Sequence, residues 1–448
     1  MPQDMHGLAI TTSSPEAAAA FDRTLRSYLN FRIDAREHLT AMVKADPEFA
    51  LGQCLKGYLT MLLYKQAAAP AAAAAAAEAR RFAPGATARE RMHVDALEAW
   101  LADDMPRTTQ IWEAILAEYP TDALALRLAH YVYFWTGRAP DMLASAERVR
   151  PKWSRELPGY GALLASLCFA HEELGNYAEA EPLGREAVEI DPTDLWGTHA
   201  VAHVMEMQGR HGEGIDWLAS LERHWEPGNN IRHHLWWHRA LYHYERREFD
   251  TVLALYDKEF RNLDSPLTKM QPDFIIDVQN AASMLFRLER QGVDAGRRWA
   301  EIADKAETRI GDCLSPFTLP HWMMALAATG RADAARRAIE GMEAFASGAG
   351  STAATVRRVA LPVCKAVLAH RRGEHTAALG LLRPVIAETQ RLGGSHAQHD
   401  VLRQMFLDSA VHAGRADDVK AVLGLVAHYP APVDRRVGYA EAARQFSH

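Results

Sequence analysis

Apolar residues recur at intervals of three and four positions along almost the whole chain, which is the period of an amphipathic helix. Sustained period-two alternation of β-branched residues, the pattern of a half-buried strand, is nearly absent. Asn-Gly hairpin turns are also not found. The pattern therefore predicts an all-α protein.

A short glycine-containing turn recurs between the predicted helices. Glycine at such a point can adopt the left-handed conformation that ends a helix. Gly175 and Gly209 are 34 residues apart, which is the period of tetratricopeptide repeats. The sequence therefore predicts that these two glycines lie at equivalent turns between paired helices. The turns are expected at Gly137, Gly175, Gly209, Gly330, Gly373 and Gly414.

Two segments resemble the tetratricopeptide consensus. Residues 161–192 have small residues at Ala180 and Ala187, where the paired helices touch, and residues 195–227 continue the pattern with Gly214 in place of the usual alanine. Elsewhere the period drifts, and the last three turn glycines are 43 and 41 residues apart. We expect one continuous right-handed superhelical solenoid that is degenerate at both ends, with N-terminal helical repeats (1–105), central tetratricopeptide-like repeats (106–265) and C-terminal degenerate repeats (266–448). The alanine-rich run 67–77 fits a helix better than a flexible joint.

Composition restricts the class of protein further. The chain has 448 residues, 48% of them hydrophobic, and a net charge of −7 with acids and bases interspersed, which argues against nucleic acid as a partner. No window approaches 18 uninterrupted apolar residues, and the N-terminus has no basic stretch followed by an apolar run, so neither a membrane span nor a signal peptide is expected. The four cysteines show no CxxC spacing and are expected to be buried free thiols. Together these features predict a cytoplasmic protein.

Four stretches carry a resemblance to a known family: Asp122–His130, Thr198–Arg210, Trp236–His238 with Tyr256-Asp257 after it, and Gly393–Gln398. Over roughly residues 5–430 the chain resembles the bacterial and animal family of tetratricopeptide repeat protein 38. The resemblance implies an α-solenoid. The name of the family describes a fold and implies no reaction.

Histidines are spaced four residues apart in two neighbouring predicted helices, as His199 and His203 and as His234 and His238. Residues at this spacing lie on one helix face, one turn apart. In a tetratricopeptide unit, positions two, five, nine and twelve of the repeat face the groove of the solenoid. If the unit starts at Leu195, the positions between these are small or apolar. The groove positions are then Trp196, His199, His203 and Glu206.

Further residues project toward the same groove. If Phe249 is equivalent to Tyr177, His234 and Trp237 face the groove, and His238 lies at its margin. The neighbouring tryptophans, Trp236 and Trp237, fit either the core or a recognition surface. His233 is expected to be solvated and His243 to pack between helices. Earlier and later helices add Arg127, Tyr131, Glu172, His321 and His396, the last two only if the superhelix closes.

The candidate catalytic residues are His199, His203, Glu206, His234 and His238. Imidazole and carboxylate groups together suit a divalent metal. The HxxxH pair lacks the glutamate that HExxH places beside the first histidine, so Glu206 would act as base or ligand. Without metal, a histidine paired with a carboxylate can act as a general base, and Arg127 can anchor an anionic substrate. The alternative is that His199 and His203 are core histidines bonded to backbone carbonyls.

Two functions from different classes remain. The first is a small-molecule pocket in the groove, with an acid–base or metal-assisted enzyme of hydrolase or lyase type as its most specific form and a small polar or anionic molecule as its ligand. The second is a scaffold that binds a peptide, a partner protein or a second copy of the chain. Histidines, tryptophans and acids in the groove, instead of asparagine, lysine and arginine clamps, favour the first. No P-loop, GxGxxG after a strand, GxSxG or catalytic cysteine setting is found.

Overall fold

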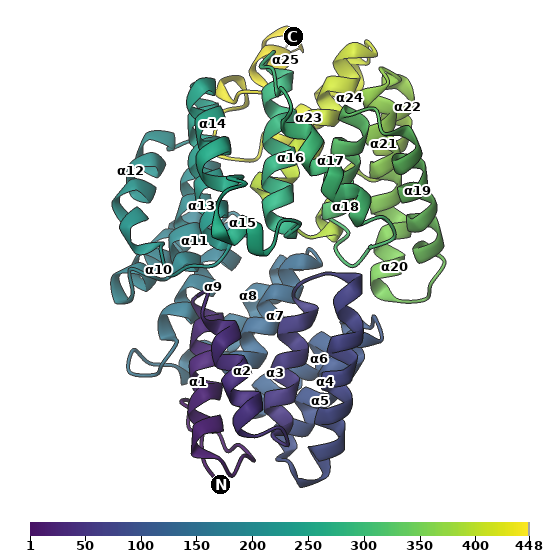
Figure 1. Cartoon of the computed structure of the whole chain (residues 1–448). Helices are drawn as coiled ribbons and strands as arrows, with labels where there is room; N and C mark the ends of the chain where they lie inside the picture. Colours follow the sequence, from purple (N-terminus) through teal and green to yellow (C-terminus); the bar gives the residue numbers. More distant parts are fainter. Residues whose placement is uncertain (447–448) are drawn as a thin grey trace. The chain divides into compact units, whose positions relative to one another are not determined.

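Helices account for all regular secondary structure in the computed structural model, which describes residues 1–446 of the chain (Figure 1). In this range the β contacts are two isolated backbone bridges, Gln3–Ala9 and Arg32–Gly228, and no strand forms. The structure therefore confirms the predicted all-α class of tetratricopeptide-like helix pairs.

The chain divides into two compact units. The first contains residues 1–201, 221–231 and 350–352, and the second contains the remainder. Helices of the first unit are α1 (Pro15–Leu29), α2 (Ala35–Ala45), α3 (Ala50–Met61), α4 (Ala69–Phe82), α5 (Ala88–Leu101), α6 (Met105–Glu118), α7 (Ala123–Trp135), α8 (Ala139–Val149), α9 (Tyr160–Glu173) and α10 (Tyr177–Ile190). The next helix, α11 (Leu195–Met207), begins in the first unit and ends in the second.

The second unit contains the later helices. They are α12 (His211–Leu221), α13 (Ile231–Glu245), α14 (Phe249–Leu255), α15 (Pro266–Met270), α16 (Ile275–Arg290), α17 (Arg298–Thr308), α18 (Thr318–Ala328), α19 (Ala332–Ala346), α20 (Ser351–Thr355), α21 (Leu361–Arg371), α22 (His375–Leu382), α23 (His396–His412), α24 (Ala416–Val426) and α25 (Ala440–Phe446), with the ends of α12, α13 and α20 assigned to the first unit. Two π-helical segments, Tyr256–Phe260 and Val356–Ala360, extend α14 and α20. Here α16 also packs against α23, more than a hundred residues away.

Consecutive helices form the packing units, as expected for repeats. The pairs α1 with α2, α3 with α4, α5 with α6 and α9 with α10 make extensive contacts across turns of a few residues. All six glycines predicted to end helices have positive φ, including Gly175 at 78° and Gly209 at 71°. These two lie after α9 and α11, the first helices of successive pairs, so the predicted equivalence is confirmed.

Four residues with side chains occupy the same left-handed turn position in other pairs. They are Phe31 (φ 52°), Tyr64 (47°), Asp103 (58°) and Arg247 (60°). From Phe31 to Arg247, successive left-handed turn residues between paired helices are 33 to 39 residues apart. The N-terminal helices therefore keep the repeat spacing without the glycine that marks it elsewhere.

Gly214 departs from the repeat consensus because of the close packing of α12 against α13. A Cβ at this position would lie 2.4 Å from Cζ of Tyr242. The Tyr242 side chain is completely buried, and its hydroxyl donates to the carbonyl oxygen of Ala202 on α11 at 2.6 Å. The absence of a side chain at Gly214 thus allows one tyrosine to join α13 to α11.

Other sequence expectations can be compared with the structure. The alanine-rich run lies mostly in α4, which buries Ala72, Ala75, Ala76 and Ala79. All four cysteines are buried free thiols, as expected. None of the helices within residues 1–446 combines the length and apolar character needed to cross a membrane. The predicted boundaries at residues 105 and 265 stay a prediction.

Candidate functional site

Helix α11 starts at the residue that the repeat register predicted. Asp194 caps its N-terminus, where Oδ1 accepts hydrogen bonds from the backbone N–H groups of Trp196 and Gly197, both at 3.0 Å. His199 and His203 follow at the groove positions of that register and are 2% and 0% exposed. The cap and the apolar partner face therefore fix the phase of both histidines.

Helix α13 supplies a second pair of histidines. Phe249 begins α14, as Tyr177 begins α10, so the condition for placing His234 on the site face is met. The side chains of His234 and His238 are 4% and 0% exposed. Burial of both rings agrees with the predicted common face.

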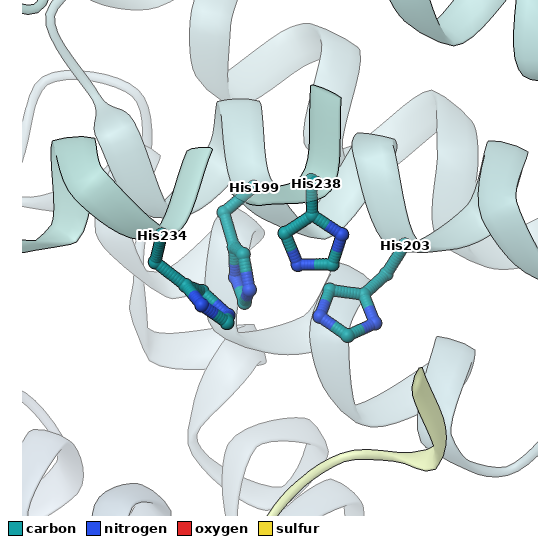
Figure 2. A group of neighbouring side chains, drawn as sticks. All are labelled: His199, His203, His234 and His238. Carbon is teal, nitrogen blue, oxygen red and sulfur yellow. The ribbon is translucent and has the colours of Figure 1, made fainter. Parts of the chain in front are cut away.

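These four side chains, hereafter the histidine quartet, converge (Figure 2). One ring nitrogen from each of His199, His203, His234 and His238 can be chosen so that all four lie within 4.8 Å of one another. Ring centroids are 4.4 Å apart for His203 and His238 and 4.7 Å apart for His234 and His238. Two helices thus bring four nitrogen ligands into a space of the size of one metal site.

Asn280 on α16 orients one member of the quartet. Nδ1 of His234 lies 2.8 Å from Oδ1 of Asn280, and an amide oxygen only accepts, so Nδ1 carries the proton. The lone pair of this imidazole is therefore on Nε2. A hydrogen bond of this kind is the usual support for a metal-binding histidine. The His234 ring also stacks on the Trp237 ring, with 5.0 Å between the ring centroids, and Trp237 is completely buried.

Burial keeps three of the four histidines, His203, His234 and His238, neutral. It lowers the pKa of His234 to about 3 and that of His238 to about 3. Burial, followed by the neighbouring imidazoles, also places the pKa of His203 well below its ordinary value. Neutral imidazoles keep a lone pair for a metal ion at neutral pH.

Glu206 lies beside the quartet, as the sequence predicted. One of its carboxylate oxygens is 3.6 Å from Nδ1 of His238, and its side chain is 14% exposed. Burial raises the pKa of Glu206 to about 7. The same side chain lines a narrow pocket of the second unit, together with His211, Arg287, His396, Asp400 and Arg436 among others.

Arg127 and Trp196 form a separate contact group in the first unit. Arg127 is 2% exposed, and the carbon of its guanidinium lies 4.7 Å from the ring centroid of Phe31 and 5.0 Å from that of Trp196. The Trp196 ring in turn lies 4.6 Å from His199. Tyr131 packs against neighbouring aromatic rings.

The remaining predicted residues lie outside the quartet. Glu172 is completely buried. His321 is buried, and one of its ring nitrogens is 2.8 Å from the backbone oxygen of Phe317. His396 lines the pocket at Glu206 and is not a member of the quartet.

Helix α13 carries two further histidines outside the quartet, and both contact a carboxylate. His233, which we expected to be solvated, is 3% exposed, and its Nδ1 lies 3.0 Å from Oδ2 of Asp277. This prediction was wrong because α16 covers the neighbouring face of α13 as well. His243 has a side chain that is 14% exposed and contacts the carboxylate of Glu248.

Sequence reasoning missed Asn280 and Asp277, the partners that α16 provides to α13. Both lie in a helix that is buried from Ile275 to Leu288. Polar residues within so buried a segment must find partners. Their presence among apolar neighbours was the available signal, but it does not identify the partner helix.

No protein-family model matches this chain. Three solved structures align with it over most of its length: a monomeric mutant of IFIT1 with Gppp-AAAA (12% identity, 97% of this chain and 96% of that chain, TM-score 0.41), Naa15/Naa10 bound to HypK-THB (13%, 96% and 66%, 0.25) and the tetratricopeptide domain of P58(IPK) (11%, 81% and 99%, 0.23). Such scores identify neither a family nor a ligand. The helix pairs themselves define the class, a tetratricopeptide-like helical-repeat protein with a buried histidine quartet.

Proposed function

We propose that this chain is a helical-repeat binding protein that holds a divalent transition-metal ion in the histidine quartet. The observation that carries the proposal is the convergence of four buried imidazole nitrogens within 4.8 Å of one another. Imidazole is a good ligand for zinc, iron, copper and nickel. Zinc is the first ion to test because it accepts four nitrogen ligands in tetrahedral geometry.

The surroundings of the quartet support metal binding over a structural role for the histidines. Asn280 directs the lone pair of His234 to Nε2, and the lowered pKa values of His234 and His238 leave both rings neutral. Metal binding at neutral pH would release no proton from these two rings.

A metal ion held by α11 and α13 would favour a binding or scaffold function over an enzymatic one. Two ligands from each helix would fix one helix pair against the next, so that metal binding and the shape of the array are coupled. Helical repeats present extended surfaces to ligands and partners. The scaffold alternative therefore follows more directly from the architecture than an enzyme does.

The test is metal analysis of purified protein followed by zinc titration of the chelator-treated protein. We expect about one zinc per chain, and at least about a tenfold loss of affinity in His203→Ala and His234→Ala. His243→Ala is the matched control, because His243 lies on the same helix outside the quartet. Equal zinc affinity in the wild type, the quartet variants and the control would refute the proposal.

A second candidate is metal-assisted or acid–base catalysis on a small polar or anionic molecule. The specific observation is Glu206, which contacts His238 and also lines the pocket that contains Arg287 and Arg436. Screening of metabolite pools by thermal shift and turnover tests this candidate, with Glu206→Gln expected to retain metal and lose turnover. If no metabolite acts, and a peptide library yields ligands that bind the His203→Ala variant equally well, the scaffold function is favoured.

A further inference from the structure

Arg127 on α7 is a buried cation without a carboxylate partner. Its side chain is buried, and among residues 1–446 no carboxylate oxygen lies within 4.0 Å of its guanidinium. The hydrogen bond that it makes is with Oγ of Ser166, at 3.5 Å, the outer limit for such a bond. Nε and Nη2 have no hydrogen-bond partner among the described residues. A charge in this position requires compensation.

Arg89 on α5 shows how the same unit treats another buried arginine. Arg89 is 3% exposed and donates to Asp122 at 2.8 Å and to Asp4 at 3.2 Å. The chain therefore supplies carboxylates to one buried guanidinium and not to the other. The N–H edge of Arg127 that Nε and Nη2 form therefore faces no anion of the described chain.

Two further polar groups near Arg127 can donate to an anion. The hydroxyl of Tyr28 is buried without a partner among the described residues, and burial raises its pKa, so it keeps its proton. Neither ring nitrogen of His130 has a partner in the same range, and burial, then the charge of Arg127, lowers the pKa of His130 well below its ordinary value. His130 is therefore neutral and has one N–H to donate. His130 lies three residues after Arg127 on α7, and its ring centroid is 6.0 Å from that of Trp196, the ring that the guanidinium also contacts. The charge of Arg127 also acts on the Tyr28 hydroxyl.

The surroundings favour a carboxylate over phosphate. Nε and Nη2 form one edge of the planar guanidinium, and this edge matches the two oxygens of a carboxylate. The neighbouring rings of Phe31 and Trp196 stack on each other at 5.3 Å and give the site an apolar wall. Asp194, which interacts with Arg127 at longer range, would repel a phosphate dianion more strongly than a monoanion. Burial raises the pKa of Asp194 to about 6, which weakens that repulsion at and below this pH.

We propose that Arg127, with Tyr28 and His130, forms a binding site for the carboxylate of a small organic acid in the first unit. The site depends on no metal ion, so it can exist whether or not the quartet binds zinc. The carboxylate site nevertheless shares a neighbouring residue with the quartet. Trp196, which forms its wall, also contacts His199 of the quartet.

The experiment is a thermal-shift and calorimetric titration of the full chain, after chelator treatment, with acetate, benzoate, phosphate and chloride at constant ionic strength. We expect saturable stabilisation by acetate and benzoate, and binding at least about tenfold weaker in Arg127→Met. Arg81→Met is the matched control, because Arg81 also lies over an aromatic ring, at 5.1 Å from the centroid of Phe82, but its side chain is 71% exposed.

A second variant keeps the test valid if Arg127→Met fails to fold. Tyr28→Phe removes one donor and no charge, and we expect it to weaken acetate binding by about threefold to tenfold. Failure of all four anions to bind would overturn the proposal, as would acetate affinity unchanged in both variants or a preference for phosphate or chloride. Because the protein is metal-free in this titration, these outcomes are independent of zinc binding at the quartet.

Discussion

Two buried arginines in the first unit provide a sharp test of the reasoning about charge. Arg89 and Arg127 are 3% and 2% exposed, but only Arg89 has carboxylate partners in the described structure. We compare the substitutions Arg89→Met and Arg127→Met, since methionine approximates the apolar stem and removes the charge. The two substitutions are chemically the same, so a difference in stability reports the difference in surroundings.

Removing Arg89 leaves two acidic side chains without their cation. Asp122 and Asp4 have side chains that are 1% and 2% exposed, and His93 remains 3.1 Å from Asp122 as its other partner. Burial alone would raise the pKa of Asp122, but His93 and then Arg89 lower it below its usual range. Breaking a buried ion pair by removing one partner costs about 3–5 kcal/mol, which is the loss expected for Arg89→Met.

Removing Arg127 breaks no ion pair, although the buried carboxylate of Asp194 loses its longer-range attraction to the guanidinium. The substitution loses two cation–aromatic contacts, at 4.7 and 5.0 Å, each worth roughly 0.5–2 kcal/mol, and one long hydrogen bond. It also removes an uncompensated buried charge, whose penalty is several kcal/mol. Without ligand, Arg127→Met should therefore lie within about 1 kcal/mol of the wild type or be more stable.

The assay is urea denaturation of both variants and the wild type, followed by tryptophan fluorescence and circular dichroism without added organic anions. A difference of at least about 2 kcal/mol between the two variants is expected from these magnitudes. If Arg127→Met loses as much stability as Arg89→Met, the charge of Arg127 is already compensated in the folded chain. Arg127 would then need no bound anion to balance its charge.

Three further predictions concern the second unit. Gly214→Ala should cost about 1–3 kcal/mol in thermal denaturation, because its Cβ would lie 2.4 Å from a buried tyrosine ring, whereas Gly212→Ala on the same helix has open space and should be neutral or stabilising. Asn280→Ala should weaken zinc binding about 10- to 100-fold in a competition titration with the helical content unchanged, and unchanged affinity would exclude Asn280 as a supporting residue. The pKa of Asp408 is lowered to about 2. Burial opposes this shift, and the hydrogen bond from His370 and nearby charges produce it. Ionised Asp408 contributes about 2.5 kcal/mol to the free energy of unfolding; this contribution is present above the pKa of Asp408 in the unfolded chain, near 4, and is lost as the pH falls through about 2. Asp408→Asn should therefore make stability depend less steeply on pH between pH 5 and 2.

The fold and the register of its central helices could be predicted from the sequence because both depend on local patterns. Helix α11 begins at Leu195, the residue from which the groove positions were counted. The regular N-terminal turns were not recognised because Phe31 and Tyr64 occupy the left-handed position there. Glycine is the usual signal for that conformation, and an aromatic residue gives none.

For a related reason, the histidines of the candidate site could be predicted from the sequence, but the residues of α16 that contact them could not. Four-residue spacing places His234 and His238 on one face of α13 whatever lies opposite. The residues opposite, Asn280 and Asp277 on α16, are more than 40 positions away in the sequence. Periodicity describes which face of a helix is buried, but it does not identify the helix that covers it, and for this reason His233 was wrongly expected to be solvated.

The geometry of the quartet depends on the packing that brings α11 and α13 together. Within each helix the spacing of the two histidines is fixed by the helical rise, so the separation of the helices is the variable that decides whether four nitrogens meet. Tyr242 lies one turn after His238 and donates to the carbonyl oxygen of Ala202, the residue before His203. That tyrosine fits only because Gly214 has no side chain. Glycine at position 214, in place of the consensus alanine, therefore contributes to the geometry of the quartet. It allows the contact of Tyr242 with α11 that sets the distance between the two helices that carry the histidines.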